Sequence, residues 1–207
     1  MNKGRLIAIE GIDGVGKNTQ AKLLRDHIVI TKGECGFFSF PRYDTPTGAL
    51  VGEYLKSGRT DLNLFEKANL YIRDRLAAKE EILSYLDRGV DVICDRYTMS
   101  NLVYMTSIAE LEHPDLLNLS STVSKYLHQV EYGLNKLPVA DSLIILSLPL
   151  SHYDKMMESK QKRDYTDQTK DKHEGDSALI KRCHEKYNSY SDGCFDNVQV
   201  LFCNGPD

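Results

Sequence analysis

The stretch LIAIEGIDGVGKNT, residues 6–19, decides the fold. Its apolar start, residues 6–9, predicts a buried strand, and helical periodicity begins at Lys17. A glycine-rich turn between a strand and a helix is the context that a phosphate-binding loop requires. Gly11, Gly14 and Gly16 allow backbone amides to turn toward a phosphate, and Lys17 can reach its outer oxygens.

Position 18 departs from the usual pattern of such loops. Ser or Thr normally binds magnesium there, whereas this chain has Asn18. Either the amide oxygen of Asn18 replaces the hydroxyl or Thr19 supplies one nearby, so the metal geometry stays open. From the loop, residues 11–19, we expect the ATP contacts to come from Gly11, Gly14, Gly16, Lys17, Asn18 and Thr19.

Strands and helices alternate along the whole chain, residues 1–207, which we interpret as one domain. Short apolar runs predict five strands, at residues 6–9, 36–40, 90–94, 142–148 and 198–203. Helical periodicity occupies residues 17–30, 47–55, 64–87, 100–110, 121–132, 152–160 and 177–188. The expected fold is therefore α/β, a five-stranded parallel sheet flanked by helices.

Charge and cysteine content narrow the function classes. The formal net charge of -4, from 26 Lys and Arg against 30 Asp and Glu, predicts no partner among nucleic acids or anionic membranes. We expect no signal peptide and no membrane span, because the first strand begins within a few residues and every apolar run is short. Five cysteines without a CxxC pair favour a reducing, cytoplasmic location.

An aromatic and basic segment, Phe40-Pro41-Arg42-Tyr43, follows the second predicted strand. Ligands of open α/β sheets bind at this carboxyl edge. Phe40 could stack on a base, and Arg42 could hold a phosphate with two hydrogen bonds. The alternative is that Phe40 belongs to the core and Arg42 to the surface.

Arg75 falls within the apolar stripe of the predicted helix 64–87. A guanidinium on a buried stripe needs an anion. Arg75 therefore either binds a substrate phosphate or forms an ion pair with a buried carboxylate. Asp74 beside it is a candidate partner or a residue on the solvent side of the helix.

The third predicted strand leads into Asp95 and Arg96 at the same sheet edge. Asp95 is positioned like the carboxylate that holds magnesium or its waters in phosphate-loop enzymes. Ser100, Asn101 and Tyr104 follow, and the last two share one helix face that suits the edge of a nucleobase. Ordinary helix capping by Ser100 and a core position for Tyr104 are the alternatives.

Residues 160–174 are almost free of apolar side chains and rich in both lysine and carboxylates. A charge run of this kind is often a solvated surface. Beside a phosphate loop it also suits a basic lid, at about residues 159–175, that surrounds a transferred phosphate and excludes water.

Taken together, EGIDGVGK (10–17), FPRY (40–43), DR (74–75), DRY (95–97) with the following Ser100, Asn101 and Tyr104, and the basic segment resemble the thymidylate kinase family over nearly the whole chain. The resemblance implies ATP- and magnesium-dependent conversion of dTMP to dTDP, for dTTP synthesis, in a homodimer. It implies the catalytic residues Lys17, Arg96, Asp13, Lys162 and Arg163, the lid residues among them replacing an arginine that some members carry in the phosphate loop.

The resemblance also assigns the remaining site residues. Phe40 would stack on thymine, Arg42 and Arg75 would hold the acceptor phosphate, and Arg96 would lie between the two phosphates. The substrate-binding set is Asp13, Phe40, Arg42, Tyr43, Arg75, Arg96, Ser100, Asn101 and Tyr104, and the metal set is Asp13, Asp95 and Glu174. His173 stands where related enzymes often have Tyr before the Glu.

Two rival functions follow from the same residues. A deoxynucleoside kinase would need a carboxylate base near the second strand, where this chain offers Arg42. A nucleotide-binding regulator without catalysis is supported by Asn18 alone. A GTPase is disfavoured because the NKxD guanine motif is missing from the sequence.

Overall fold

The sheet has five parallel strands, as predicted. The computed structural model describes residues 3–57, 61–150, 176–189 and 198–202. Strands β1 (Leu6–Glu10), β2 (Gly36–Ser39), β3 (Val92–Asp95), β4 (Ser142–Ser147) and β5 (Val198–Phe202) pair in the order β2-β3-β1-β4-β5. The central strand β1 is buried along its whole length, because neighbouring strands and helices cover it on every side.

The helices agree with the predicted ranges to within a few residues. They are α1 (Lys17–Lys32), α2 (Pro46–Ser57), α3 (Leu64–Asp87), α4 (Thr98–Glu112), α5 (Leu119–His128) and α7 (Ser177–Ser189). The predicted helix 121–132 instead divides into α5 and a π-helical turn, η1 (Gln129–Leu134). The predicted helix 152–160 and the basic segment 159–175 lie outside the described residues.

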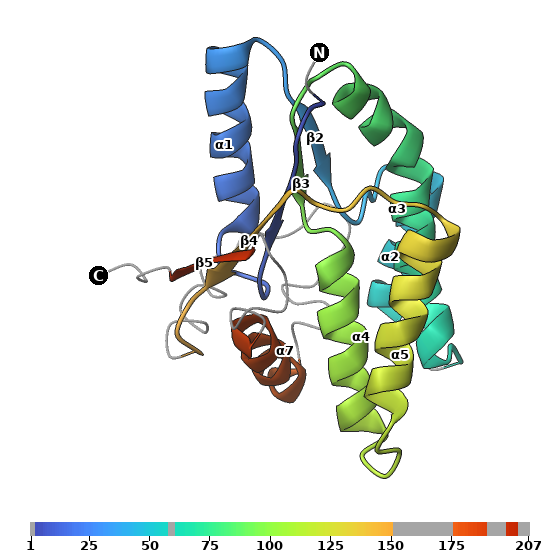
Figure 1. Cartoon of the computed structure of the whole chain (residues 1–207). Coiled ribbons are helices and arrows are strands. Elements are labelled where there is room, and N and C mark those ends of the chain that lie inside the picture. Colours follow the sequence, from blue (N-terminus) through green and yellow to red (C-terminus); the bar gives the residue numbers. More distant parts are fainter. Residues whose placement is uncertain (1–2, 58–60, 151–175, 190–197, 203–207) are drawn as a thin grey trace.

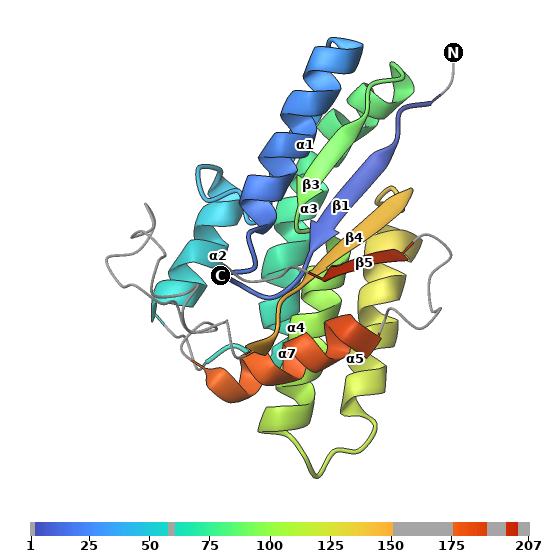
Figure 2. The ribbon, with the colours of Figure 1, turned by 90° about the vertical axis from the view of Figure 1, so that its left-hand side faces the viewer.

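Helices cover both faces of the sheet. Helix α1 lies on one face, and α3, α4 and α5 lie on the other (Figures 1 and 2). Helix α7 runs across the carboxyl end of the sheet, against α4 and β4. This arrangement brings residues from both ends of the chain to the edge where β1 enters the phosphate loop.

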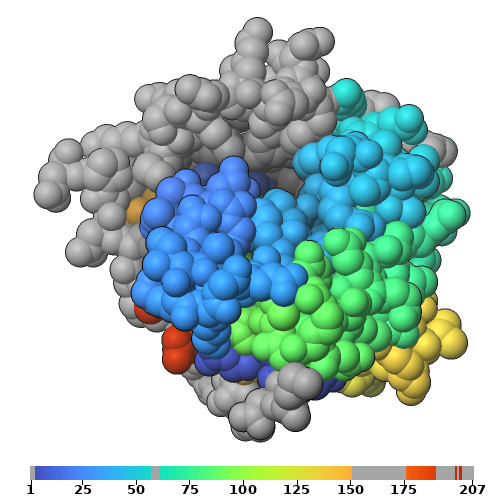
Figure 3. Space-filling view, turned by 90° about the horizontal axis from the view of Figure 1, so that it is seen from above, coloured from blue at the N-terminus to red at the C-terminus, as the bar shows by residue number. Residues whose placement is uncertain are grey.

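The opposite, amino end of the sheet is held by polar contacts between the ends of helices. Figure 3 looks onto this end, where the segments following α1 and α3 lie side by side. There Arg88 donates to Glu34 at 2.9 Å, and both side chains are half exposed. Within the described residues, no helix is both long and apolar enough to cross a membrane.

Helix α3, which carries Asp74 and Arg75, begins with a reciprocal cap. The Asn63 side chain accepts from the amides of Phe65 and Glu66, each at 3.0 Å, and the Glu66 carboxylate accepts from the Asn63 amide at 2.8 Å. Such a cap stabilises a helix by about 1 kcal/mol. It fixes where this long helix starts and therefore which residues it directs inward.

Candidate functional site

The phosphate loop has the geometry that its glycines predict. Gly11, Gly14 and Gly16 have φ angles of 138°, 84° and 87°, a region that favours glycine. A β-carbon on Gly11 would lie 2.4 Å from the carbonyl oxygen of Leu146, so a larger residue does not fit there. Gly16 precedes α1 and has no side chain to cap the helix, which leaves the first amides of α1 to face a phosphate.

Lys17 and Asn18 open helix α1 and point in different directions. The buried Lys17 ammonium donates to the carbonyl of Ile12 at 2.7 Å, across the loop. The Asn18 amide donates to Asp95 Oδ2 at 3.0 Å, and Ser39 donates to the same oxygen at 3.1 Å. Asn18 thus presents its nitrogen to the carboxylate, which joins α1 to the ends of β2 and β3. Thr19 is exposed on the next position.

Arg96 has an unusual backbone conformation, and both terminal nitrogens of its side chain donate hydrogen bonds. Its φ of 67° lies in the left-handed region, which is costly for a residue other than glycine and is typical of functional sites. The guanidinium donates to Asp13 at 2.5 Å and to Ser100 at 3.0 Å, and it lies 5.5 Å from the centre of the Tyr104 ring. Burial opposes its charge, but neighbouring groups, Asp13 foremost, outweigh this and raise the pKa of Arg96.

Asp13 is the carboxylate that connects the phosphate loop to helix α4. One of its oxygens accepts from Arg96, and the other accepts from the Tyr104 hydroxyl at 2.9 Å. Burial, followed by the charge of Asp13, raises the pKa of Tyr104 well above its usual value, so its hydroxyl keeps its proton. The predicted residues Asp13, Arg96, Ser100 and Tyr104 are therefore in one connected network.

Glu10 is a part of the site that the sequence analysis did not assign. Its side chain is completely buried at the end of β1. It accepts from the amides of Tyr97 and Ser100 at 2.7 and 3.1 Å, from the Ser100 hydroxyl at 2.5 Å and from the Tyr187 hydroxyl at 3.0 Å. A carboxylate at the end of an otherwise apolar strand was the available signal, because a buried charge needs several donors.

Arg42 is held by Asp74, a buried residue on α3. The Asp74 carboxylate accepts from the Arg42 amide at 2.8 Å and from its Nε at 3.3 Å, and the Asp74 carbonyl accepts from an Arg42 terminal nitrogen at 2.9 Å. Gly48 packs so close that a β-carbon there would lie 1.9 Å from the Arg42 carbonyl oxygen. Asp74 is thus the partner of Arg42 and does not face solvent; Tyr43 is half-buried beside it.

Arg75 forms an ion pair with Glu131 of η1, and both side chains are almost completely buried. Asn101 also donates to Glu131, at 3.3 Å, and to the carbonyl of Ala68, at 3.3 Å. Of the two roles expected for Arg75, this geometry matches the ion pair with a buried carboxylate. Glu131 was missed because its partner lies on a distant segment and because the π-helical turn that carries it was expected to continue a regular helix.

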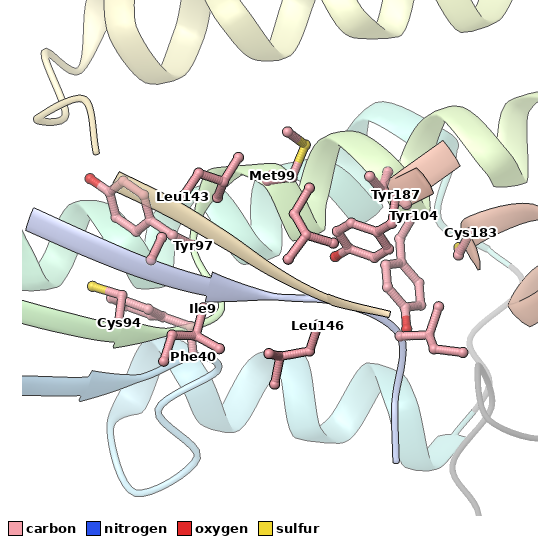
Figure 4. Close-up of a cluster of buried hydrophobic side chains, with 14 of the residues drawn as sticks. Ile9, Phe40, Cys94, Tyr97, Met99, Tyr104, Leu143, Leu146, Cys183 and Tyr187 are labelled. Carbon is pink, nitrogen blue, oxygen red and sulfur yellow. The ribbon is translucent and has the colours of Figure 1, made fainter. Parts of the chain in front are cut away.

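Phe40 belongs to the core cluster, the alternative that its segment left open. It is 5% exposed, and its ring lies 6.3 Å from that of Phe38 and 6.2 Å from that of Tyr97. Figure 4 shows it beside Ile9 under the central strand, at a distance from the Tyr104 and Tyr187 rings, which lie together near α7. The Arg42 guanidinium carbon lies 5.8 Å from the centre of the Phe40 ring, so the ring adjoins a predicted site residue, and its stacking on a base stays a prediction.

The carboxyl edge of the sheet therefore brings together the phosphate loop, Asp13, Asp95, Arg96, Ser100 and Tyr104. Phe40 and Arg42 follow β2 on the same edge, and Phe40, Arg75 and Asn101 are buried. The predicted residues Lys162, Arg163 and Glu174 fall outside the described residues. In the part of the chain that is described, no group of three His, Cys, Asp or Glu side chains is arranged to hold a metal ion without further ligands.

This fold and loop define a P-loop nucleotide-binding protein. The family model for thymidylate kinase matches residues 9–126. A thymidylate kinase of Mycobacterium tuberculosis is 30% identical over 186 residues, which is 88% of this chain and 83% of that protein. The chain belongs to the thymidylate kinase family.

Other similarities are shorter or concern the fold alone. A thymidylate kinase of Plasmodium falciparum is 33% identical over 117 residues, 56% of this chain and 55% of that protein. One of Schizosaccharomyces pombe is 35% identical over 50% of this chain and 49% of that one, so the matches span about half the length of these relatives. The solved structure of the Candida albicans thymidylate kinase has a TM-score of 0.68 and 24% identity, covers 97% of this chain and 84% of that one, and shows the same fold.

Proposed function

We propose that this chain phosphorylates dTMP to dTDP with ATP, in the synthesis of dTTP. Membership of the thymidylate kinase family supports the substrate pair. The observation that carries the proposal is the contact between the phosphate loop and Arg96: the Asp13 carboxylate within the loop accepts from the guanidinium at 2.5 Å. This contact supports the assignment of Arg96 as the cation that would lie between a phosphate held by the loop and the acceptor phosphate.

Donor binding is assigned to the phosphate loop. The amides at Gly11, Gly14, Gly16 and the start of α1 would surround the β- and γ-phosphates, and Lys17 would exchange its contact with the Ile12 carbonyl for the phosphate oxygens. Asn18 and Thr19 complete the donor set. The acceptor phosphate is itself the anionic nucleophile, so the transfer needs no general base. Catalysis then consists of in-line positioning and of neutralising charge on the transferred group.

Acceptor binding is assigned to the residues around Arg96. Arg42, oriented by Asp74, would hold the dTMP phosphate with Tyr43 beside it, and Arg96 would lie between donor and acceptor phosphates. Asp13, Ser100 and Tyr104 would position the sugar side of the nucleotide. As the resemblance implies, Phe40 would stack on thymine, Arg75 would hold the acceptor phosphate with Arg42, and Asn101 would contact the nucleotide. Arg75 and Asn101 both donate to Glu131, which orients the two side chains.

Magnesium is proposed as the metal that accompanies ATP, where it would neutralise charge on the phosphates. The residues present fit a water-mediated site. The described contacts of Asp95 fall on Oδ2 and come from neutral donors, which leaves Oδ1 for metal-bound water. Both oxygens of Asp13 already accept hydrogen bonds, so Asp13 would act through its neighbours. Glu174 stays a candidate ligand from the sequence alone.

Three further parts of the proposal rest on the sequence: the family resemblance implies lid cations and a homodimer, and the cysteine pattern favours the cytoplasm. Lys160, Lys162 and Arg163 would supply lid cations. The chain would work as a homodimer in the cytoplasm. Leu50 on α2 and Leu76 on α3, each 39% exposed, are apolar residues on the helices that we propose for the dimer contact. Light scattering of the purified chain decides the oligomeric state.

A coupled assay of ADP release tests the proposed reaction. ATP and magnesium are supplied with dTMP, dUMP, UMP, dCMP, dGMP or thymidine. We expect turnover with dTMP well above that with each other acceptor. Turnover with thymidine alone would instead assign a nucleoside kinase, and ATP binding without turnover on any acceptor would assign a regulator.

A further inference from the structure

The buried Glu10 carboxylate joins three parts of the chain that are far apart in sequence. It ends β1, and its donors are Tyr97 and Ser100 at the start of α4 and Tyr187 on α7. Four donor hydrogens face its two oxygens, so its acceptor capacity is used completely. Glu10 is one peptide bond from the phosphate loop, and the network therefore connects α7 directly to that loop.

The network also fixes the direction of one hydroxyl. Ser100 has a single hydroxyl proton, and its 2.5 Å contact directs that proton to Glu10. A lone pair of the same oxygen then accepts from Arg96 at 3.0 Å. Without Glu10 as acceptor, the Ser100 hydroxyl could turn its proton toward the guanidinium and lose this contact.

Tyr187 supplies the last donor from the far end of the chain. Its hydroxyl donates to Glu10 at 3.0 Å and lies 3.2 Å from the Ser100 oxygen. Burial, with the nearby Glu10 charge, raises the pKa of Tyr187 well above its usual value, so the hydroxyl remains a donor at neutral pH. Figure 4 shows Tyr187 and Tyr104 side by side, and Tyr104 donates to Asp13, so α7 lies close both to the Glu10 network and to the Asp13 partner of Arg96.

Arg96 needs such support because its own backbone is unfavourable. Its φ of 67° persists only if surrounding contacts hold it. The Arg96 amide donates to the Ile9 carbonyl at 2.9 Å, and the following residue, Tyr97, donates its amide to Glu10. Glu10 thus acts on Arg96 in two ways: it accepts from the backbone amide of the next residue, and it orients the Ser100 hydroxyl that accepts from the guanidinium.

We propose that Glu10 and Tyr187 are positioning residues that hold Arg96 in its reactive orientation and make that orientation depend on helix α7. The inference rests on the proposed function, because Arg96 is the cation assigned to the two phosphates. It adds a role for α7, the helix that begins at Ser177.

A double-mutant cycle tests whether Tyr187 acts through Arg96. Tyr187→Phe keeps the buried ring and removes only the hydroxyl. We expect it to lower kcat by about 10-fold, with KM for ATP and dTMP nearly unchanged. In an Arg96→Lys background the same change should lower kcat by less than about twofold. Lysine has no guanidinium, so the hydrogen bond from Arg96 to Ser100 is already lost there.

Two matched changes keep the cycle interpretable. Tyr126→Phe removes a hydroxyl that donates to Asn69 at 2.9 Å, remote from Arg96, and should leave kcat unaltered. Ser100→Ala should lower kcat like Tyr187→Phe and replaces it in the cycle if that variant does not fold. Equal losses from Tyr187→Phe in both backgrounds would overturn the proposal, since a purely structural change lowers both rates by one factor.

A spectroscopic measurement separates this inference from the proposed reaction. In protein labelled with nitrogen-15 at arginine, restricted rotation of the Arg96 guanidinium should give separate terminal-nitrogen signals, assigned by their loss in Arg96→Lys. Tyr187→Phe should average them, whereas Tyr126→Phe should not. If wild-type protein phosphorylates none of the acceptors, the proposed reaction fails, but these spectra still test whether Tyr187 orients Arg96. Unchanged Arg96 signals in Tyr187→Phe would overturn the positioning role.

Discussion

Strand β3 separates two aspartates, Asp91 just before its first residue and Asp95 at its last. Asp91 is 4% exposed and accepts from the Arg5 amide at 2.9 Å, the Arg5 guanidinium at 3.1 Å and the Lys32 ammonium at 2.7 Å. Asp95 is equally buried, but its described contacts are the neutral donors Asn18 and Ser39. Three residues, Val92, Ile93 and Cys94, thus separate a carboxylate that contacts two cations from one whose described partners carry no charge.

The difference shows how the two ends of one sheet take different roles. At the amino end, Arg5 and Lys32 compensate the charge of Asp91, so we assign this carboxylate to the stability of the fold and not to a ligand. At the carboxyl end, the proposed function assigns the loop amides, Lys17 and Arg96 to phosphates, and it assigns Asp95 to a magnesium ion that would arrive with the nucleotide. We therefore expect changes at the carboxyl end to alter turnover and changes at the amino end to alter the free energy of unfolding.

The largest expected effect is that of Lys17→Met, which keeps the buried apolar stem and removes the charge. The variant should lose about 10²- to 10³-fold in kcat with dTMP, because a preorganised cation on the transferred group is lost. The midpoint of urea unfolding should shift little. Steady-state kinetics and urea titrations measure the two quantities on the same preparation.

A control at the same loop sharpens this result. Gln20→Ala changes an exposed residue in the first turn of α1, next to the loop but outside the assigned site, and should leave kcat nearly unchanged. If Lys17→Met mainly lowered the free energy of unfolding and left kcat intact, the carboxyl end would be as structural as the amino end, and the comparison would fail.

Asp91→Asn should have the opposite pattern. It retains the size of the side chain but removes the charge that Arg5 and Lys32 face. We expect a loss of about 1 to 3 kcal/mol in the free energy of unfolding, since a buried acceptor is weakened while both cations remain more than half exposed. Turnover of the folded enzyme should stay unchanged, as measured by kcat after correction for the folded fraction.

Arg88→Ala provides the matched control for Asp91→Asn. It removes an ion pair with Glu34 at the same end of the sheet, but both partners of this pair are about half exposed. Its cost in the free energy of unfolding should be much smaller than that of Asp91→Asn, because solvent and salt screen an exposed pair. A larger loss from Arg88→Ala than from Asp91→Asn would contradict the role given to the buried carboxylate.

The sequence was sufficient to predict the sheet and the phosphate loop, because both depend on local signals. Apolar runs of strand length predicted all five strands, and the spacing of Gly11, Gly14 and Gly16 before Lys17 predicted the loop. The position of Arg96 at the sheet edge near the phosphate loop was also predictable, since carboxyl ends of parallel strands share one edge, whereas its contact with Asp13 comes from the structure.

Partners that depend on tertiary packing were not predictable in the same way. The ion pair of Arg75 with Glu131 joins α3 to a π-helical turn 56 residues away, and no local spacing specifies it. Likewise, the burial of Phe40 between Phe38 and Tyr97 depends on how β2 and β3 align. Charged or aromatic residues at a sheet edge therefore indicated a site without indicating which of them face it.

The smallest expected effect concerns the acid dependence of stability at the amino end. Burial opposes the charge of Asp91, but hydrogen bonds from Arg5 and Lys32 outweigh it and lower the pKa of Asp91 from 3.8 to about 2. Above pH 3.8 the carboxylate is ionised in both folded and unfolded protein, so its full contribution is present. As the pH falls toward 2, the unfolded chain binds the proton first and the contribution disappears.

This loss should amount to about 1 to 2 kcal/mol, after allowance for the exposure of both cations. Urea titrations at several pH values between 5 and 2 measure it as the difference between wild-type protein and Asp91→Asn. Glu110, whose pKa is also lowered to about 2 by Lys186, Ser120 and Arg182 despite its burial, titrates in both proteins and cancels in that difference. The variant should therefore show a shallower fall in stability with acid, and equal slopes would mean that Asp91 does not carry the charge-dependent stability of this end of the sheet.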